Sequence, residues 1–265
     1  MTWSLEGAYD AYPQIEEEFS TELEESLNPR DPGMLLDLVA DLGLAPGSVA
    51  IDVGCGEGRH ALALATRFGF TVTGIDPVPR HVQVARATAG VAGATFILGT
   101  AEDLPASDAI ADLIWCRDVL VHVADLGRAY AEFRRVLRPG GRAVIYQMFG
   151  TKRLESREAS WLWSTMGVVP ASADIGQAEA AMKSSGLRID QSIDLSSEWG
   201  EWAEEHHGGP NQKLLHAARL LRDPARYAGS YGQDAYDMML GDCLWHVYAM
   251  IGKLTRRVYV LSSPS

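Results

Sequence analysis

The sequence predicts an α/β fold built on a doubly wound, seven-stranded sheet with helices on both faces. Residues 49–60 begin as an apolar run typical of a strand buried on both faces, break into glycines and then continue as a helix. Four more strand candidates, separated by helical segments, follow before residue 150. Short βα units in series imply neighbouring parallel strands joined by right-handed crossovers.

Predicted strands and helices alternate along the chain. The strands cover 49–53, 70–76, 94–98, 111–116, 142–148, 187–193 and 257–261, and the helices cover 32–42, 59–68, 78–89, 128–137 and 175–185. Asp31 is expected to cap the first of these helices and Gly43 to end it. We expect a single domain over 1–265, with a binding core at 45–150 and the rest of the sheet at 151–194 and 254–265.

Two regions have no predicted place in the sheet. Residues 1–44 are rich in acidic and aromatic side chains before their helix, and we expect 1–30 to cap the ligand crevice, although a mobile acidic tail is the alternative. Residues 195–253 are too long for a hairpin and contain helical segments with many aromatic residues and histidines. We expect this second region to form a helical lid over the carboxyl ends of the strands.

Composition narrows the class of protein. The 265 residues carry 23 Lys and Arg against 35 Asp and Glu, a formal net charge of −12, which disfavours nucleic-acid and anionic-membrane partners. No apolar run approaches the length of a membrane-spanning helix, and we expect a cytoplasmic protein. Cys55, Cys116 and Cys243 are widely separated, so neither a disulfide framework nor a zinc knuckle is indicated. The oligomeric state stays open.

The glycine turn after the first strand has the spacing D-x-G-x-G-x-G. A nicotinamide-binding turn has the spacing G-x-G-x-x-G, which would put its third glycine at position 59, where Arg59 stands. Asp52 at the end of the strand would repel a pyrophosphate and attract an ammonium group. The other interpretation is an ordinary strand-to-helix turn without a ligand.

Asp76 ends the second predicted strand, 18 positions after Gly58. This is close to the spacing at which an acidic residue binds ribose hydroxyls, and a carboxylate can accept both hydrogens of a vicinal diol. The alternative is that Asp76, followed by Pro77, only caps the next helix. The joint spacing with the glycine turn favours a ribose-containing ligand.

Two further motifs follow in order, A-E-D-L-P at 101–105 and L-R-P-G-G at 137–141. With the glycine turn and Asp76, they resemble the class I S-adenosylmethionine (SAM) methyltransferases. The resemblance implies SAM as cofactor and a mostly parallel sheet with the seventh strand antiparallel beside the sixth. Thr100 stands where the family often has an acidic residue, so we transfer the family's adenine contact only to Ala101, Glu102 and Asp103. The cofactor-binding residues that we predict are Asp52, Gly54, Cys55, Gly56, Asp76, Pro77, Ala101, Glu102, Asp103 and Arg117.

The stretch R-D-x-x-x-H, with Arg117, Asp118 and His122, starts where the fourth strand ends. His122 lies one helical turn after Asp118, so both side chains can face one pocket, and a histidine can take a proton near neutral pH. The alternative is that His122 lies on a helix surface or packs against the cofactor without acting as a base.

This stretch and the segment D-L-S-S-E-W at 194–199 resemble the phosphoethanolamine methyltransferases. The resemblance implies that Asp118 lines the acceptor pocket and that His122 pairs with an N-terminal tyrosine, Tyr9 or Tyr12, as a catalytic latch. The family's phosphate-holding tyrosine is absent, since Met148 and Phe149 occupy that region. We therefore do not transfer the phosphoamine substrate.

Aromatic side chains near the sixth strand can stack on an acceptor. Trp161, Trp199, Trp202 and His246 are the candidates, with core or lid packing as the alternative, and the histidine spacing gives little support to a metal site. The sequence thus predicts SAM-dependent methyl transfer to a nitrogen or oxygen atom of a small biosynthetic molecule. The alternatives are methylation of a carbon atom and a non-catalytic SAM-binding protein.

Overall fold

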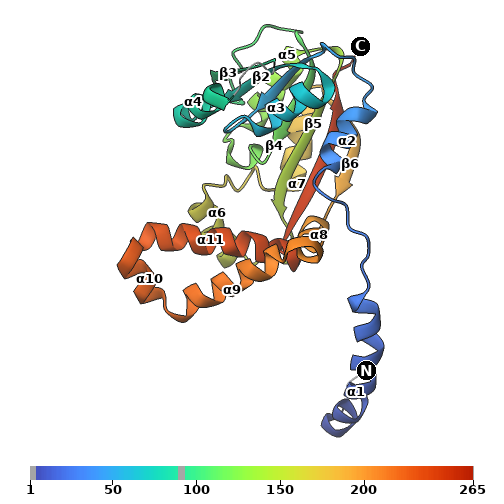
Figure 1. Ribbon diagram of the computed structural model, residues 1–265, viewed down its shortest axis with the longest axis vertical. Coiled ribbons are helices and arrows are strands. Elements are labelled where there is room, and N and C mark those ends of the chain that lie inside the picture. Colours follow the sequence, from blue (N-terminus) through green and yellow to red (C-terminus); the bar gives the residue numbers. More distant parts are fainter. Residues whose placement is uncertain (1–3, 89–92, 265) are drawn as a thin grey trace.

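The computed structural model describes residues 4–88 and 93–264 and shows seven strands in one sheet (Figure 1). The strands are β1 (Val49–Val53), β2 (Thr71–Asp76), β3 (Ala94–Leu98), β4 (Ala111–Arg117), β5 (Leu137–Gly150), β6 (Arg188–Asp194) and β7 (Leu254–Ser262). Their order across the sheet is β3-β2-β1-β4-β5-β7-β6. Only β7 is antiparallel to its two neighbours, β5 and β6, among the described strands. The predicted fold class is confirmed.

Helices flank the sheet and extend beyond it (Figure 1). They are α1 (Leu5–Glu24), α2 (Met34–Asp41), α3 (Arg59–Phe68), α4 (Pro79–Thr88), α5 (Leu126–Val136), α6 (Ser156–Met166), α7 (Ile175–Ser184), α8 (Glu198–His207), α9 (Gly209–Arg222), α10 (Pro224–Tyr231) and α11 (Gln233–Met250), with a short 3₁₀ helix η1 (Leu120–His122). Residue 89 of the predicted helix 78–89 lies outside the described residues.

Alternate residues of each central strand enter two different hydrophobic clusters, one on each face of the sheet. In β4, Ile114 and Cys116 join the cluster that contains α5 and α7, whereas Leu113 and Trp115 join the cluster that contains α2, α3 and α4. Side chains in a strand point alternately to opposite faces, so a strand covered on both faces needs apolar residues at every position. This explains why the strands appear in the sequence as continuous apolar runs.

Several element boundaries differ from the prediction. The helix α2 begins at Met34 with Gly33 as its N-cap, and the Asp31 carboxylate accepts a hydrogen bond of 2.5 Å from the Gly33 amide outside the helix. The strand β7 begins at Leu254, because it pairs with β5 from Arg142 and Ser262 as far as Gly150 and Leu254. This long pairing starts in residues that are too polar to indicate a strand by themselves.

The segment between β6 and β7 forms helices α8 to α11. Figure 1 shows α9, α10 and α11 as a helical layer beyond the carboxyl end of β5. Helix α1 projects away from the rest of the molecule in the same view, and none of its residues is buried. The predicted cap at 1–30 and lid at 195–253 therefore stay predictions.

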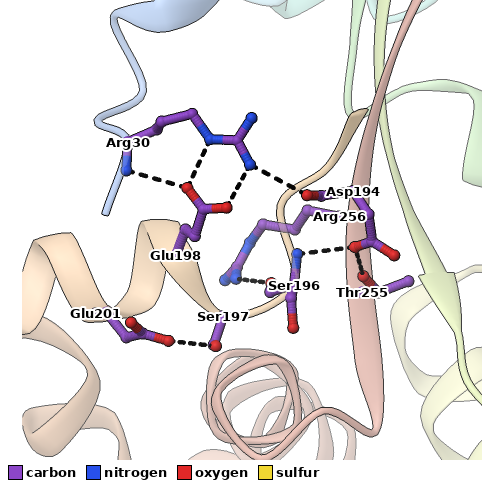
Figure 2. A network of polar contacts seen from close by, with 8 residues as sticks. All are labelled: Arg30, Asp194, Ser196, Ser197, Glu198, Glu201, Thr255 and Arg256. Carbon is purple, nitrogen blue, oxygen red and sulfur yellow. Dashed lines mark hydrogen bonds and ion pairs between the residues drawn. The ribbon is translucent and has the colours of Figure 1, made fainter. Parts of the chain in front are cut away.

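Arg30 holds the connection between α1 and α2 to the start of α8 (Figure 2). The Arg30 backbone amide and Nε both donate to Glu198 Oε2 at the start of α8, at 3.1 and 2.6 Å. Its guanidinium also donates to the carbonyl oxygen of Asp194 at 3.2 Å, and the Asp194 carboxylate accepts from Thr255 on β7 at 2.6 Å. This network joins the N-terminal segment, β6, α8 and β7 beside the candidate site.

Candidate functional site

A cavity of about 440 Å³ lies at the carboxyl ends of β1, β2 and β4. We call it the cofactor cavity. An open parallel sheet binds its ligands at this edge. The predicted cofactor residues that line it are Gly54, Gly56, Asp76, Pro77, Ala101, Glu102 and Arg117.

The glycine turn forms one wall of this cavity and needs its glycines for two different reasons. Gly56 has φ of 53°, and a Cβ there would meet nothing within 4 Å, so its missing side chain leaves open space in the cavity. Gly54 has φ of 72°, and a Cβ there would lie 2.0 Å from a methyl carbon of Val119. Amides of the turn are fixed by Ile75, whose carbonyl oxygen accepts from the Gly54 amide at 2.7 Å.

Asp76 links this turn to the helix that follows β2. One carboxylate oxygen accepts from the Gly56 amide and the other from the Val78 amide, both at 2.9 Å, and His81 Nδ1 lies 3.2 Å from the second oxygen. Each carboxylate oxygen has two lone pairs. The oxygen bonded to Gly56 keeps one for a ligand hydroxyl, and the other oxygen keeps one when the hydrogen of the neutral His81 ring is on Nε2. The two interpretations of Asp76, as helix cap and as diol acceptor, are therefore compatible.

Three predicted cofactor residues lie outside the cavity lining. Asp52 is 2% exposed beneath the glycine turn, and its Oδ2 has no hydrogen-bond partner within the described part of the chain. Burial raises the pKa of the Asp52 carboxyl to about 7, and the Asp76 charge adds to this effect. Cys55 is buried, which raises the pKa of its thiol to about 12, and Asp103 is exposed away from the cavity.

A second cavity of about 280 Å³ adjoins the first one. We call it the acceptor cavity. It shares Arg117 and Asp118 with the cofactor cavity and extends between β5, β7 and helices α8, α9 and α11. Of the predicted substrate residues, Asp118, Trp199 and His246 line it.

Trp161 and Trp202 line neither cavity. Trp161 packs against hydrophobic clusters between α6 and α11, and Trp202 stacks on His206 at a ring distance of 4.4 Å. The structure thus places both indoles where they pack within the helical layer. Their predicted contact with an acceptor has no support from this geometry.

Arg117 at the end of β4 forms part of the wall common to both cavities. Its Nη1 lies 3.1 Å from His60 Nε2, and its Cζ lies 5.6 Å and 5.4 Å from the ring centroids of Tyr146 and Trp199. Burial and the Arg117 charge lower the pKa of His60 to about 4. A neutral His60 accepts the hydrogen bond from Arg117, which fixes the guanidinium between the cavities.

Asp118 adopts a left-handed backbone conformation, with φ of 58°, before η1 begins. The expectation that His122 follows Asp118 by one turn of a common helix is therefore wrong, but both residues line the cofactor cavity. Asp118 is exposed to the space of the two cavities, but the protein around these cavities encloses its carboxyl group. Burial raises the pKa of its carboxyl to about 6, and the nearby charges of Arg117 and Arg256 oppose this rise.

His122 is held by the backbone of α6's last turn. Its Nδ1 lies 2.9 Å from the carbonyl oxygen of Gly167. A carbonyl oxygen only accepts hydrogen bonds, so Nδ1 carries the hydrogen, and Nε2 of the neutral ring keeps a free lone pair. Tyr9 and Tyr12 lie on α1 with 74% and 59% of their surface exposed, so the structure does not bring them to His122, and that pairing stays a prediction.

The structure adds residues that the sequence did not indicate. His81 and Thr100 line the cofactor cavity, and Tyr146, Lys213, Trp245 and Arg256 line the acceptor cavity. His81 follows Asp76 by five residues at the start of a predicted helix, which is a usable signal. Lys213 and Trp245 come from α9 and α11, whose placement depends on packing between helices far apart in sequence.

Other features of the structure do not point to a site. A hollow of about 550 Å³ near Gly150–Arg153 and Leu254–Arg257 contains none of the predicted site residues, so we place the site at the two adjoining cavities. Within residues 4–88 and 93–264, no three His, Cys, Asp or Glu side chains are grouped closely enough to hold a metal ion. Over the same residues, no helix combines the length and the apolar character needed to cross a membrane.

Comparison with known proteins gives the class of this chain. A family model described as a methyltransferase domain matches residues 51–145. The 27-O-demethylrifamycin SV methyltransferase of Amycolatopsis mediterranei is 30% identical over 190 residues, which are 68% of this chain and 70% of that protein. An O-methyltransferase of Pyrenophora dematioidea is 29% identical over 61% of this chain, but the match spans only 62% of its own length. The chain belongs to the class I SAM-dependent methyltransferase family, as predicted.

A solved structure agrees at the level of the fold. Phosphoethanolamine N-methyltransferase 2 of Haemonchus contortus, in complex with S-adenosyl-L-methionine, superposes with a TM-score of 0.66 at 19% identity. The match covers 91% of this chain and 55% of that one. At this identity, the likeness shows the shared architecture alone.

Proposed function

We propose that this chain is an enzyme that transfers a methyl group from SAM to a nitrogen or oxygen atom of a small molecule. The observation that carries this proposal is the pair of adjoining cavities, which share Arg117 and Asp118, with His122 in the lining of the cofactor cavity. A cofactor and an acceptor need to meet at one wall for a direct transfer. We place the reaction in a cytoplasmic biosynthetic pathway. The acidic composition of the chain and the absence of a long apolar run from its sequence agree with this proposal.

The residues of the cofactor cavity fit SAM. Gly56 leaves open space against the backbone, Asp76 has acceptor capacity for a ribose diol, and the apolar Ala101 and Val123 lie in the same lining, where an adenine ring can pack. When bound, SAM supplies a methyl group activated by its sulfonium, which an acceptor nucleophile takes by in-line displacement. Such a reaction depends mainly on alignment and exclusion of water.

The chain's own groups then orient the acceptor and handle its proton. The free lone pair of His122 Nε2 can accept a proton from a hydroxyl or ammonium acceptor, with Nδ1 anchored on Gly167. Asp118 can orient a donor group of the acceptor from the shared wall. Closure of residues 1–30 and 195–253 over both cavities is part of this proposal, because water exclusion favours the transfer.

Mass spectrometry with SAM that carries a trideuterated methyl group tests the proposal. Incubation with a library of phenols, carboxylic acids, amines and enolisable carbon acids should yield a product heavier by the labelled methyl group. Fragmentation of that product places the label on oxygen, nitrogen or carbon, which decides between the main proposal and carbon methylation. A protein that binds SAM but labels no member of the library or of a cell metabolite extract would favour the non-catalytic alternative.

A further inference from the structure

The acceptor cavity has a distinct charge pattern. Its lining contains three cationic side chains, Arg117 from β4, Lys213 from α9 and Arg256 from β7. Lys213 pairs with the carboxylate of Asp242 on α11, so Arg117 and Arg256 remain against the single carboxylate in the lining, that of Asp118. The fourth ionisable group, His246, has a lowered pKa, first because it is buried. It therefore adds no positive charge near neutral pH. The cavity thus has excess positive charge in a protein of net charge −12.

Arg256 is the most informative of these cations. It is only 5% exposed, and within the described residues it makes no ion pair with a carboxylate. Its Nη1 donates to the carbonyl oxygen of Ser196 at 3.3 Å, as Figure 2 shows. Burial of a guanidinium without a carboxylate in contact is costly, and the Asp118 charge nearby offsets part of that cost. Besides the bond to Ser196, the guanidinium contacts the Tyr146 hydroxyl, and its other donors remain available. A ligand anion in the adjoining cavity would satisfy them.

Flat aromatic groups form another part of the lining. The rings of Tyr146 and Trp199 stack 4.5 Å apart at an angle of 8°, and Trp245 contributes a second indole. A cavity of about 150 Å³ holds a benzene molecule. The 280 Å³ of the acceptor cavity therefore suits a compound of one or two rings.

We propose that the acceptor is a planar aromatic compound that carries an anionic group, a carboxylate or a phosphate. Arg256 pairs with the anion, the charge of Arg117 adds to the attraction, and the ring packs against the indole lining. This inference rests on the proposed function, since it takes the second cavity as the acceptor site. It narrows the acceptor from any small molecule to one chemical class.

Calorimetric titrations in the presence of saturating S-adenosylhomocysteine test the inference with three probes of one shape. Benzoate and phenyl phosphate carry the anion, and benzamide is the neutral match of benzoate. At least one anion should bind tenfold or more tightly than benzamide, and the phenyl phosphate arm distinguishes the two anions. The preference should weaken as salt is raised.

Arg256→Gln should reduce the anion preference at least tenfold while benzamide binding changes little. Arg219→Gln, the same change at an exposed position of α9 outside the cavity, is the matched control and should keep the preference. If Arg256→Gln does not fold, the wild-type comparison of benzoate with benzamide and its salt dependence still decide.

Equal binding of all three probes, or binding of none of them, to a protein that binds S-adenosylhomocysteine would overturn the acceptor class and leave the proposed function standing. Failure of the wild-type protein to bind S-adenosylhomocysteine would overturn both.

Discussion

The His122 ring has a fixed orientation, and its Nε2 is available to accept a proton. The Gly167 carbonyl holds Nδ1, and the ring lines the cofactor cavity close to Asp118. A side chain held in this way costs little reorganisation when it accepts a proton.

We expect His122→Ala to lower turnover by roughly 10²–10⁴-fold, the usual contribution of a general base. SAM affinity should stay within a few fold, because the glycine turn and Asp76 are unchanged. His81→Ala is the matched control, since His81 lines the same cavity and contacts Asp76 but has no role in proton transfer, so it should weaken SAM binding more than turnover. Steady-state kinetics with calorimetry separate the two effects. Full turnover of His122→Ala at neutral pH would show that this histidine only packs against its neighbours and does not act as a base.

Asp52 offers a test that depends on pH. Burial raises the pKa of its carboxyl to about 7 in the folded protein, so between pH 4 and pH 7 the folded state holds a proton that the unfolded state has released. The free energy of unfolding therefore falls as pH rises through this window, by up to about 1.4 kcal/mol per pH unit from this group. Asp52→Asn should remove that slope.

Urea unfolding of wild type and Asp52→Asn at pH 5 and pH 7 measures the difference. The substituted protein should gain stability relative to wild type as pH rises. Identical pH dependence of the two proteins would show that folding does not raise the pKa of Asp52, in conflict with its unpaired buried oxygen.

The α1 helix and the Arg30 network belong to the next larger scale. Helix α1 has no buried residue, yet the segment after it is fixed to α8 by Arg30 and Glu198 (Figure 2). Pro32, two residues beyond Arg30, lines the acceptor cavity. The N-terminal region therefore has one end held beside the acceptor cavity, and its other end, α1, has no buried residue.

Hydrogen exchange should slow in residues 1–30 and 195–253 when S-adenosylhomocysteine is added, because contacts with a ligand stabilise a closed lid. Gly56→Val is the control, since its side chain would occupy the open space in the cofactor cavity and prevent the effect. Equal exchange of the wild-type segments with and without ligand would contradict closure.

The sheet could be predicted from the sequence because its strands have local signals. Strands buried on both faces are continuous apolar runs, and each glycine or acidic residue at a strand's end marks the ligand edge. For this reason the sequence put Gly54, Gly56 and Asp76 at one edge of the sheet, and in the structure all three line one cavity. Asp52 was predicted at the same edge, but its side chain is buried beneath the glycine turn. The alternation of side chains along a strand does not by itself predict which of these two positions the carboxylate takes.

The acceptor cavity could be predicted only in part. Trp199 and His246 were expected there, but Lys213, Trp245 and Arg256 reach it through packing of α9, α11 and β7, whose positions depend on contacts distant in sequence. Trp161 and Trp202 were predicted to contact the acceptor, but they pack against other side chains. Aromatic content alone does not distinguish a tryptophan that packs between helices from one that faces a ligand.

At the scale of the whole molecule, the account depends on one claim, that the cavity between the glycine turn and Asp76 binds SAM. Calorimetric titration of S-adenosylhomocysteine into wild type and Asp76→Ala measures it directly. Wild type should bind one equivalent, and Asp76→Ala, shown to be folded by its thermal transition, should bind at least tenfold more weakly, because two charge-assisted hydrogen bonds of about 1.5–3 kcal/mol each are lost. Unchanged affinity in a folded Asp76→Ala protein, or no binding to wild type, would contradict the claim.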